Sequence, residues 1–317
     1  MIVGMHRSGT SASTGALQCV GVDLGPRLYK GHQGINDKGY FEHEDIADTN
    51  DEVLLTLGSA WDDLLPRQDE WWQDRRLRPF AQAMTRIIQR DFSSSALWAV
   101  KDPRICRLLP WWLDILASEQ VAPHFLFVVR SPEAVFRSLE RRDGFSREKA
   151  HWLWVLHYLE AERASRGHPR VFTDFDRFLE NPVKALKTIE TTLGLRYPVP
   201  VDQAAGCLGR FLAKDLRHHQ NGSREADALP IVELAREAHQ LLLAAAAGHA
   251  DETAFDALWQ RVQLLQSGFS PVLVEQIRAL EKRRGELQLF TLKALRSWSW
   301  WVGKPVRYLE RWMGRDV

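Results

Sequence analysis

The chain has 317 residues, of which 45% are hydrophobic and 26% are charged, a composition typical of a globular protein. Its 42 basic and 41 acidic residues leave a net charge of +1, so its overall charge does not indicate a nucleic-acid partner. Three widely spaced cysteines without a CxxC pair indicate neither a disulfide framework nor a zinc site, and a reduced compartment fits them.

The first predicted element is a short apolar strand that leads through a glycine-rich turn into a helix. Gly4 and Gly9 lie five residues apart, and a helical pattern covers residues 10–20. Glycines let the backbone curl until several N–H groups converge, and a helix N-terminus adds unpaired amides and the positive end of its dipole. The sequence therefore predicts an anion-binding loop at residues 4–11.

The residues of this loop indicate which kind of anion it binds. Its spacing is Gly-x-x-x-x-Gly-x-Ser, the frame of a nucleotide-phosphate loop, but Thr10 occupies the usual lysine position and Arg7 is its only strong cation. Kinases and NTPases use that lysine together with Mg²⁺ to bind a triphosphate. A sulfuryl group carries less charge and can be served by hydrogen-bond donors and one or two cations. The loop therefore favours sulfuryl transfer over phosphoryl transfer.

The sequence Gly-Met-His-Arg-Ser-Gly-Thr-Ser at residues 4–11 resembles the loop of the bacterial sulfotransferases, and the resemblance covers residues 1–220. It implies a three-layer, P-loop-like α/β fold with a central parallel sheet. It also implies 3′-phosphoadenosine 5′-phosphosulfate as co-substrate, with no metal required. The loop residues expected to bind this co-substrate are His6, Arg7, Ser8, Gly9, Thr10 and Ser11.

An acidic and aromatic segment, residues 36–45, follows a loop and precedes a predicted helix at about 44–57. In the sulfotransferases such a segment places an acidic residue at the acceptor hydroxyl, and Glu42 is the matching position. A positioned base typically contributes a factor of about 10² to 10⁴, because the acceptor alcohol must lose its proton. His43 is the alternative base. An acid that merely serves a helix dipole is the structural alternative for Glu42.

A short buried strand at residues 97–100 ends in Lys-Asp-Pro-Arg at residues 101–104, which matches the bacterial family. Polar groups at the carboxyl end of a parallel strand face the crevice in which ligands bind. Lys101 is therefore a candidate for neutralising charge on the transferring group, with a surface salt bridge as the alternative. In the cytosolic sulfotransferases the catalytic histidine stands at the position of Pro103. The resemblance therefore favours Glu42 as the base.

The apolar run at residues 125–129 predicts a central parallel strand. Ser131 as N-cap and Pro132 at the first helical position begin the following helix. Arg130 and Ser138 match the sulfotransferase element that binds the 3′-phosphate. Arginine suits that dianion because its planar fork can donate two parallel hydrogen bonds.

The other predicted elements of this domain are mostly helices: one or two over 61–92, and one each at about 105–117, 145–166 and 176–193, with a strand at 171–175. A polar segment at residues 209–229 contains Arg217. The resemblance suggests that Arg217 binds the nucleotide, as basic C-terminal loops do in the cytosolic enzymes.

From about residue 230 the pattern is helical, which predicts an extension at 230–317 beside a sulfotransferase domain at 1–220. Residues 278–317 hold ten Lys/Arg and four Asp/Glu, a net charge of +6. Between Ile277 and Trp312, apolar residues recur at helical spacing: Ile277, Leu280, Leu287, Phe290, Ala294, Trp298 and Trp301. Such a helix can lie in a membrane interface, or it can dock on the domain or on a partner subunit. The chain shows no signal sequence and no membrane-spanning run, so we expect it in the cytoplasm, with contact to the inner face of the membrane through this helix.

These residues together predict direct in-line transfer of a sulfuryl group to an acceptor hydroxyl. Glu42 would take the acceptor proton, and Arg7 and Lys101 would stabilise the transferring oxygens. The family resemblance implies a carbohydrate or glycolipid acceptor. Two other functions stay open: a P-loop kinase that phosphorylates a small molecule with ATP and Mg²⁺, and a non-catalytic nucleotide-binding module.

Overall fold

The computed structural model describes residues 1–29, 39–212 and 229–296. The chain divides into two compact units: Met1–Val53 with Trp61–Gly268, and Leu54–Ala60 with Phe269–Val317. Two helices that the sequence assigned to the C-terminal extension, α10 (Pro230–Ala246) and α11 (Glu252–Ser267), belong to the first unit. The division into units lies near Gly268, whereas the extension predicted from the sequence begins at about residue 230.

The first unit contains a small parallel sheet of three strands in the order β1-β2-β3. The strands are β1 (Ile2–Val3), β2 (Phe125–Val129) and β3 (Arg170–Asp174). Every residue of β2 is buried, as expected for the centre of a parallel sheet. The predicted strand at residues 97–100 is present only as two isolated bridges, Ile2 to Lys101 and Asp23 to Trp98. The fold is a mostly helical α/β fold.

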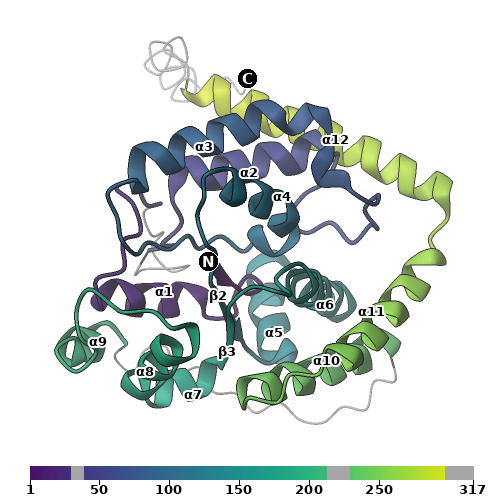
Figure 1. Cartoon of the computed structure of the whole chain (residues 1–317). Helices are drawn as coiled ribbons and strands as arrows, with labels where there is room; N and C mark the ends of the chain where they lie inside the picture. The colour runs from purple at the N-terminus through teal and green to yellow at the C-terminus, as the bar shows by residue number, and fades with distance from the viewer. Residues whose placement is uncertain (30–38, 213–228, 297–317) are drawn as a thin grey trace, which may run out of the picture. The chain divides into compact units, whose positions relative to one another are not determined.

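Helices cover both faces of this sheet, and Figure 1 shows β2 and β3 between α1, α7 and α8 on one side and α5 and α6 on the other. Leu126 and Val128 of β2 share one apolar core with Val171 of β3 and with α1 and α8. Phe127 lies outside that core and stacks on Phe172, because successive side chains of a strand point to opposite faces.

The helices of the first unit not yet bounded are α1 (Thr10–Cys19), α2 (Glu44–Thr56), α3 (Arg78–Phe92), α4 (Ile105–Ser118), α5 (Pro132–Asp143), α6 (Arg147–Ala164), α7 (Phe175–Glu180), α8 (Pro182–Leu193) and α9 (Ala205–Phe211). Two 3-10 turns, η1 (Trp71–Gln73) and η2 (Arg75–Leu77), precede α3. The C-terminal residues of α2 belong to the second unit, which also holds α12 (Pro271–Arg296). No helix in the described ranges has both the length and the apolar character needed to cross a membrane.

The helix predicted at 176–193 is two helices, α7 and α8. The break lies at Asn181 and Pro182, where the Asn181 side chain accepts a hydrogen bond from the Lys184 amide and caps α8. Proline has no N–H group and favours the first turn of a helix, so it begins α8 and does not continue α7.

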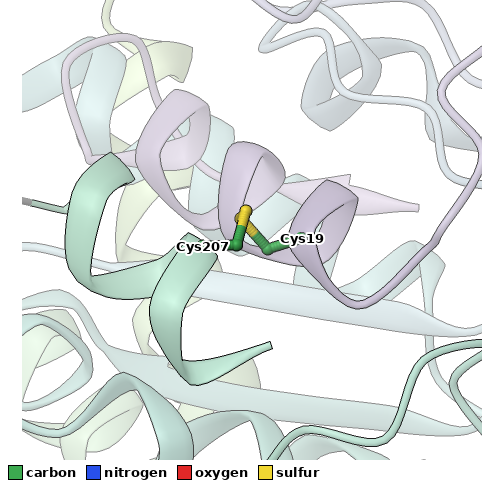
Figure 2. Close-up of a disulfide and its surroundings, with 2 residues drawn as sticks. All are labelled: Cys19 and Cys207. Carbon is green, nitrogen blue, oxygen red and sulfur yellow. A yellow bond between two sulfur atoms is a disulfide. The ribbon is translucent and has the colours of Figure 1, made fainter. Parts of the chain in front are cut away.

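A disulfide joins Cys19, the last residue of α1, to Cys207 of α9 (Figure 2). The expectation of no disulfide is therefore wrong, because only the fold brings together two cysteines 188 residues apart in the sequence. The cysteine argument for a reduced compartment fails with it. Phe211 at the end of α9 packs on α1 as well, since a Cβ added at Gly15 would lie 2.1 Å from its ring. Cys106 is a free thiol, and burial raises its pKa to about 12.

Candidate active site

The predicted anion-binding loop lies between β1 and α1, and both of its glycines are required by close contacts. Gly9 has a φ of +89° and begins α1, and a Cβ added there would lie 2.1 Å from the ring of Phe175. A Cβ added at Gly4 would lie 2.9 Å from the Val128 carbonyl oxygen. Only residues without a side chain fit at these two positions, so the loop is held close to the ends of β2 and β3.

Arg7 also has a left-handed backbone, with a φ of +69°. A non-glycine residue in this region costs on the order of 1–3 kcal/mol and persists only where its surroundings fix it. Here the Arg130 side chain donates a hydrogen bond to the Arg7 carbonyl at 3.0 Å, and the Arg7 Nε donates to Ser138 Oγ at 2.7 Å.

These contacts bring together three predicted ligands from the loop, the end of β2 and α5. The Arg130 guanidinium also lies 5.3 Å from the ring centre of Phe175. Burial lowers the pKa of Arg7, and the nearby cations Arg142 and Arg130 lower it further. Burial likewise lowers the pKa of Arg130. Partly buried guanidinium groups that lie beside other cations form a natural site for an anion.

Glu42 and Lys101 form a buried ion pair beside the first turn of α1. Lys101 Nζ donates to Glu42 Oε1 at 2.6 Å and to the Tyr40 carbonyl at 3.0 Å. Ser11 Oγ donates to the same carbonyl at 3.2 Å. The proposed base, the proposed charge-neutralising lysine and the start of α1 therefore share one hydrogen-bonded group.

Arg104 is a neighbour of Glu42 that the sequence did not single out as a site residue. Its Nη1 lies 3.8 Å from Glu42 Oε2 and 2.9 Å from Asp102 Oδ1. Its Nη2 donates to Asp51 Oδ2 at 2.9 Å. Burial lowers the pKa of Arg104, but its carboxylate neighbours more than offset this effect and raise the pKa above the ordinary value.

Hydrogen bonds from α2 and α4 hold the Asp102 carboxylate in place. It accepts a hydrogen bond from Asn50 Nδ2 at 2.8 Å, and Asn50 Oδ1 accepts one from Trp112 Nε1 at 3.0 Å. Asn50 is fully buried on the apolar face of α2, between Ile46 and Leu54. A polar residue at a core position of the helical pattern is the only sign of this network in the sequence.

His43 and His6 have surroundings that differ from those of Glu42. His43 Nε2 lies 3.0 Å from Asp91 Oδ2, and its ring packs against Phe92 at the end of α3. Burial lowers the pKa of His43, and Asp91 opposes that effect. The His6 ring lies 4.3 Å from the ring of Trp61, and burial lowers the pKa of His6 well below 6.5. His6 is therefore neutral near pH 7.

The other predicted loop residues lie at the start of α1. Ser8 and Thr10 are buried, and the Ser8 amide donates to the Met5 carbonyl at 3.1 Å. Arg217 lies outside the described residues. Within the described ranges, no group of three or more His, Cys, Asp or Glu side chains could hold a metal ion.

Comparisons of the chain with protein-family models, with curated proteins and with solved structures find no match. Arg7, Arg130 and Ser138 form a cationic cluster, and Glu42, Lys101 and the Tyr40 carbonyl form a second, carboxylate-containing cluster. Both contact the loop or the first turn of α1. Such an arrangement can bind an anion and hold a carboxylate next to it.

Proposed function

We propose that the chain is a sulfotransferase that moves a sulfuryl group from 3′-phosphoadenosine 5′-phosphosulfate to a hydroxyl of an acceptor. The observation that carries this proposal is the position of the two clusters around one loop, the arginine cluster at Arg7 and the Lys101–Glu42 pair at Ser11. The parallel sheet with helices on both faces agrees with a three-layer, P-loop-like fold, which forms part of the proposal.

In the proposed reaction the acceptor oxygen attacks sulfur while the bond from sulfur to the bridging phosphate oxygen breaks. Arg130 and Ser138 hold the 3′-phosphate, and the N-terminus of α1 holds the 5′-phosphate. Arg7 and Lys101 stabilise the charge on the transferring and leaving oxygens. Glu42 receives the proton of the acceptor hydroxyl, and 3′-phosphoadenosine 5′-phosphate leaves.

The acceptor class comes from the family resemblance alone, which favours a carbohydrate or a glycolipid. Thr10 stands at the position where a P-loop kinase has its lysine. This disfavours the alternative of a kinase that uses ATP and Mg²⁺. A non-catalytic nucleotide-binding module would bind the nucleotide without transferring a group.

Thermal unfolding with added nucleotide tests the proposal. We expect 3′-phosphoadenosine 5′-phosphate to stabilise the protein by about 2.7 kcal/mol at a hundredfold excess over Kd. Stabilisation by ATP·Mg²⁺ in its place would support the kinase, and stabilisation by neither nucleotide would refute a nucleotide site. Incubation with ³⁵S-labelled co-substrate and a mixture of glycans then separates an enzyme, which labels a glycan, from a binding module, which does not.

A further inference from the structure

The carboxylate of Glu42 lies between two cations and uses a different oxygen for each. Oε1 accepts a hydrogen bond from Lys101 at 2.6 Å, and Oε2 lies 3.8 Å from Arg104. We propose that the co-substrate's sulfonate displaces Glu42 from Lys101, and that Arg104 is the positioning residue that retains the released carboxylate. This exchange rests on the proposed function, because it requires a sulfonate at Lys101.

Lys101 offers a single positive charge, and the Glu42 carboxylate is already paired with it. Its side chain is 4% exposed, and it already donates to Glu42 and to the Tyr40 carbonyl. An ammonium group has three donors and no acceptor. One donor of Lys101 remains, but a sulfonate bound there would share one positive charge with the adjacent Glu42 carboxylate. The two anions would repel each other, so the sulfonate competes with Glu42 for Lys101.

The displaced Glu42 carboxylate would be costly to leave buried without a partner. Arg104 is held in place by Asp102 and Asp51, so its position does not depend on Glu42. A shift of roughly 1 Å would bring Oε2 of Glu42 within hydrogen-bond distance of Arg104 Nη1. The carboxylate can thus exchange one cation for another without becoming unpaired.

The exchange has a consequence for the order of the reaction. While Lys101 occupies Oε1, that oxygen is engaged by a strong donor. Once the sulfonate has taken over Lys101, Oε1 can accept a hydrogen bond from the acceptor hydroxyl in place of the one from Lys101, and then its proton. Binding of the co-substrate therefore frees the oxygen of Glu42 that faces Lys101.

The test compares two nucleotides that differ only in the sulfonate. We expect Glu42→Gln to tighten binding of 3′-phosphoadenosine 5′-phosphosulfate about tenfold, because the competing charge is removed, and to change the affinity for 3′-phosphoadenosine 5′-phosphate by less than about twofold. Arg104→Gln should weaken the sulfonate-bearing nucleotide selectively. Glu133→Gln on α5, a carboxylate paired with Arg137 and Arg147, is the matched control and should change neither affinity.

Calorimetric titration of each folded variant gives both affinities. Equal changes for the two nucleotides in Glu42→Gln would overturn the exchange while leaving the proposed function intact. Failure of the unmodified protein to bind either nucleotide would instead refute the proposed function, and the exchange with it. Glu42→Gln and Arg104→Gln report independently, so a folding defect in one leaves the other as the test.

In the second unit, α12 has an exposed face that carries apolar side chains. Leu273, Ile277, Leu280 and Leu287 recur at helical spacing and are exposed, with Leu280 66% accessible. Another face of the same helix packs within the unit, since a Cβ added at Gly285 would lie 2.1 Å from Leu55. The helix carries six basic and three acidic residues.

From this apolar stripe and its basic excess we infer that α12 binds the surface of a membrane that contains anionic lipid. An amphipathic helix of this kind buries its apolar face at the acyl boundary, and each basic residue near an anionic surface contributes about 1 kcal/mol. A second copy of the chain is less suited to the stripe, because Arg284 lies one turn after Leu280 and would face its equivalent in a parallel pair.

Co-sedimentation of the full chain with vesicles tests this inference. We expect binding to phosphatidylserine-containing vesicles at low salt, little binding to pure phosphatidylcholine, and loss of binding in the double variant L280E/L287E. Leu264→Glu on α11, a change at another exposed leucine, is the matched control and should bind normally. No binding to anionic vesicles would overturn the inference. Self-association that L280E/L287E abolishes, without vesicle binding, would assign the stripe to a second copy.

Discussion

Arg130 supports the main chain of Arg7, although the two guanidinium groups carry like charges. The Arg130 side chain donates to the Arg7 carbonyl, and the Arg7 backbone is in the left-handed region. A change at either residue therefore affects both the charge of the loop and its shape. Experiments on these residues need a readout that separates the two effects.

We expect Arg130→Ala to weaken binding of 3′-phosphoadenosine 5′-phosphate by about 10- to 100-fold, the scale of one lost hydrogen bond to a charged group. The analogue without the 3′-phosphate should lose much less affinity. Calorimetric titration with both nucleotides measures the difference, and Arg137→Ala on α5 is a control that keeps the net charge the same as in the variant. Equal losses for the two nucleotides would assign Arg130 to loop shape alone.

Glu42 and His43 show the limit of prediction at the scale of single residues. The sequence presents them as adjacent candidates for one role. In the structure Glu42 meets Lys101, which is 59 residues away in the sequence, while His43 meets Asp91 of α3. Their partners come from separate elements, so the local sequence cannot distinguish the two surroundings. The role of either as base stays a prediction.

Among the elements, α9 depends most clearly on a covalent link. We expect the double variant C19S/C207S to unfold about 2–5 kcal/mol more readily, because the disulfide closes a long loop and restricts the unfolded chain. Urea unfolding with and without dithiothreitol measures this. The reductant should destabilise the unmodified protein and have no effect on the double variant. An unmodified protein that is insensitive to the reductant would contradict the prediction.

Elements with strong local signals were predicted from the sequence. The helix predicted at 145–166 is α6, and the apolar run predicted as a central strand is β2. The break at Asn181 and the reduction of the strand at residues 97–100 to two bridges were not predicted. A capping side chain and a strand edge depend on contacts that a hydrophobic pattern does not contain.

At the scale of the whole molecule, buried histidines make the stability of the fold depend on pH. Burial lowers the pKa of His6 and His157 well below 6.5, and it also lowers the pKa of His151 and His239. These groups stay neutral in the folded chain but take up protons in the unfolded chain below about pH 6.5. Acid therefore favours the unfolded state, and stability is lost as the pH falls through 6.5 toward the folded-state pKa values.

We accordingly expect the free energy of unfolding to decrease between pH 7 and pH 5. Each such histidine contributes at most about 1.4 kcal/mol per pH unit. Urea titrations at several pH values measure the slope, which should be smaller in His157→Gln. The exposed His249 provides the control, because His249→Gln should leave the slope unchanged. A pH-independent stability over this range would contradict the prediction.

The pairing of β1 with β2 also affects how the protein is made. Ile2 pairs with Leu126, and Cys19 forms its disulfide with Cys207, so both early residues have partners that are synthesised much later. At about 5–20 residues per second, a ribosome needs roughly 6–25 s to synthesise the chain between the two strands. During that time the glycine-rich loop has emerged without the neighbours that shape it. A nascent chain must therefore keep its first apolar residues from wrong partners until the second strand leaves the ribosome, and slow translation before residue 125 would prolong that exposure.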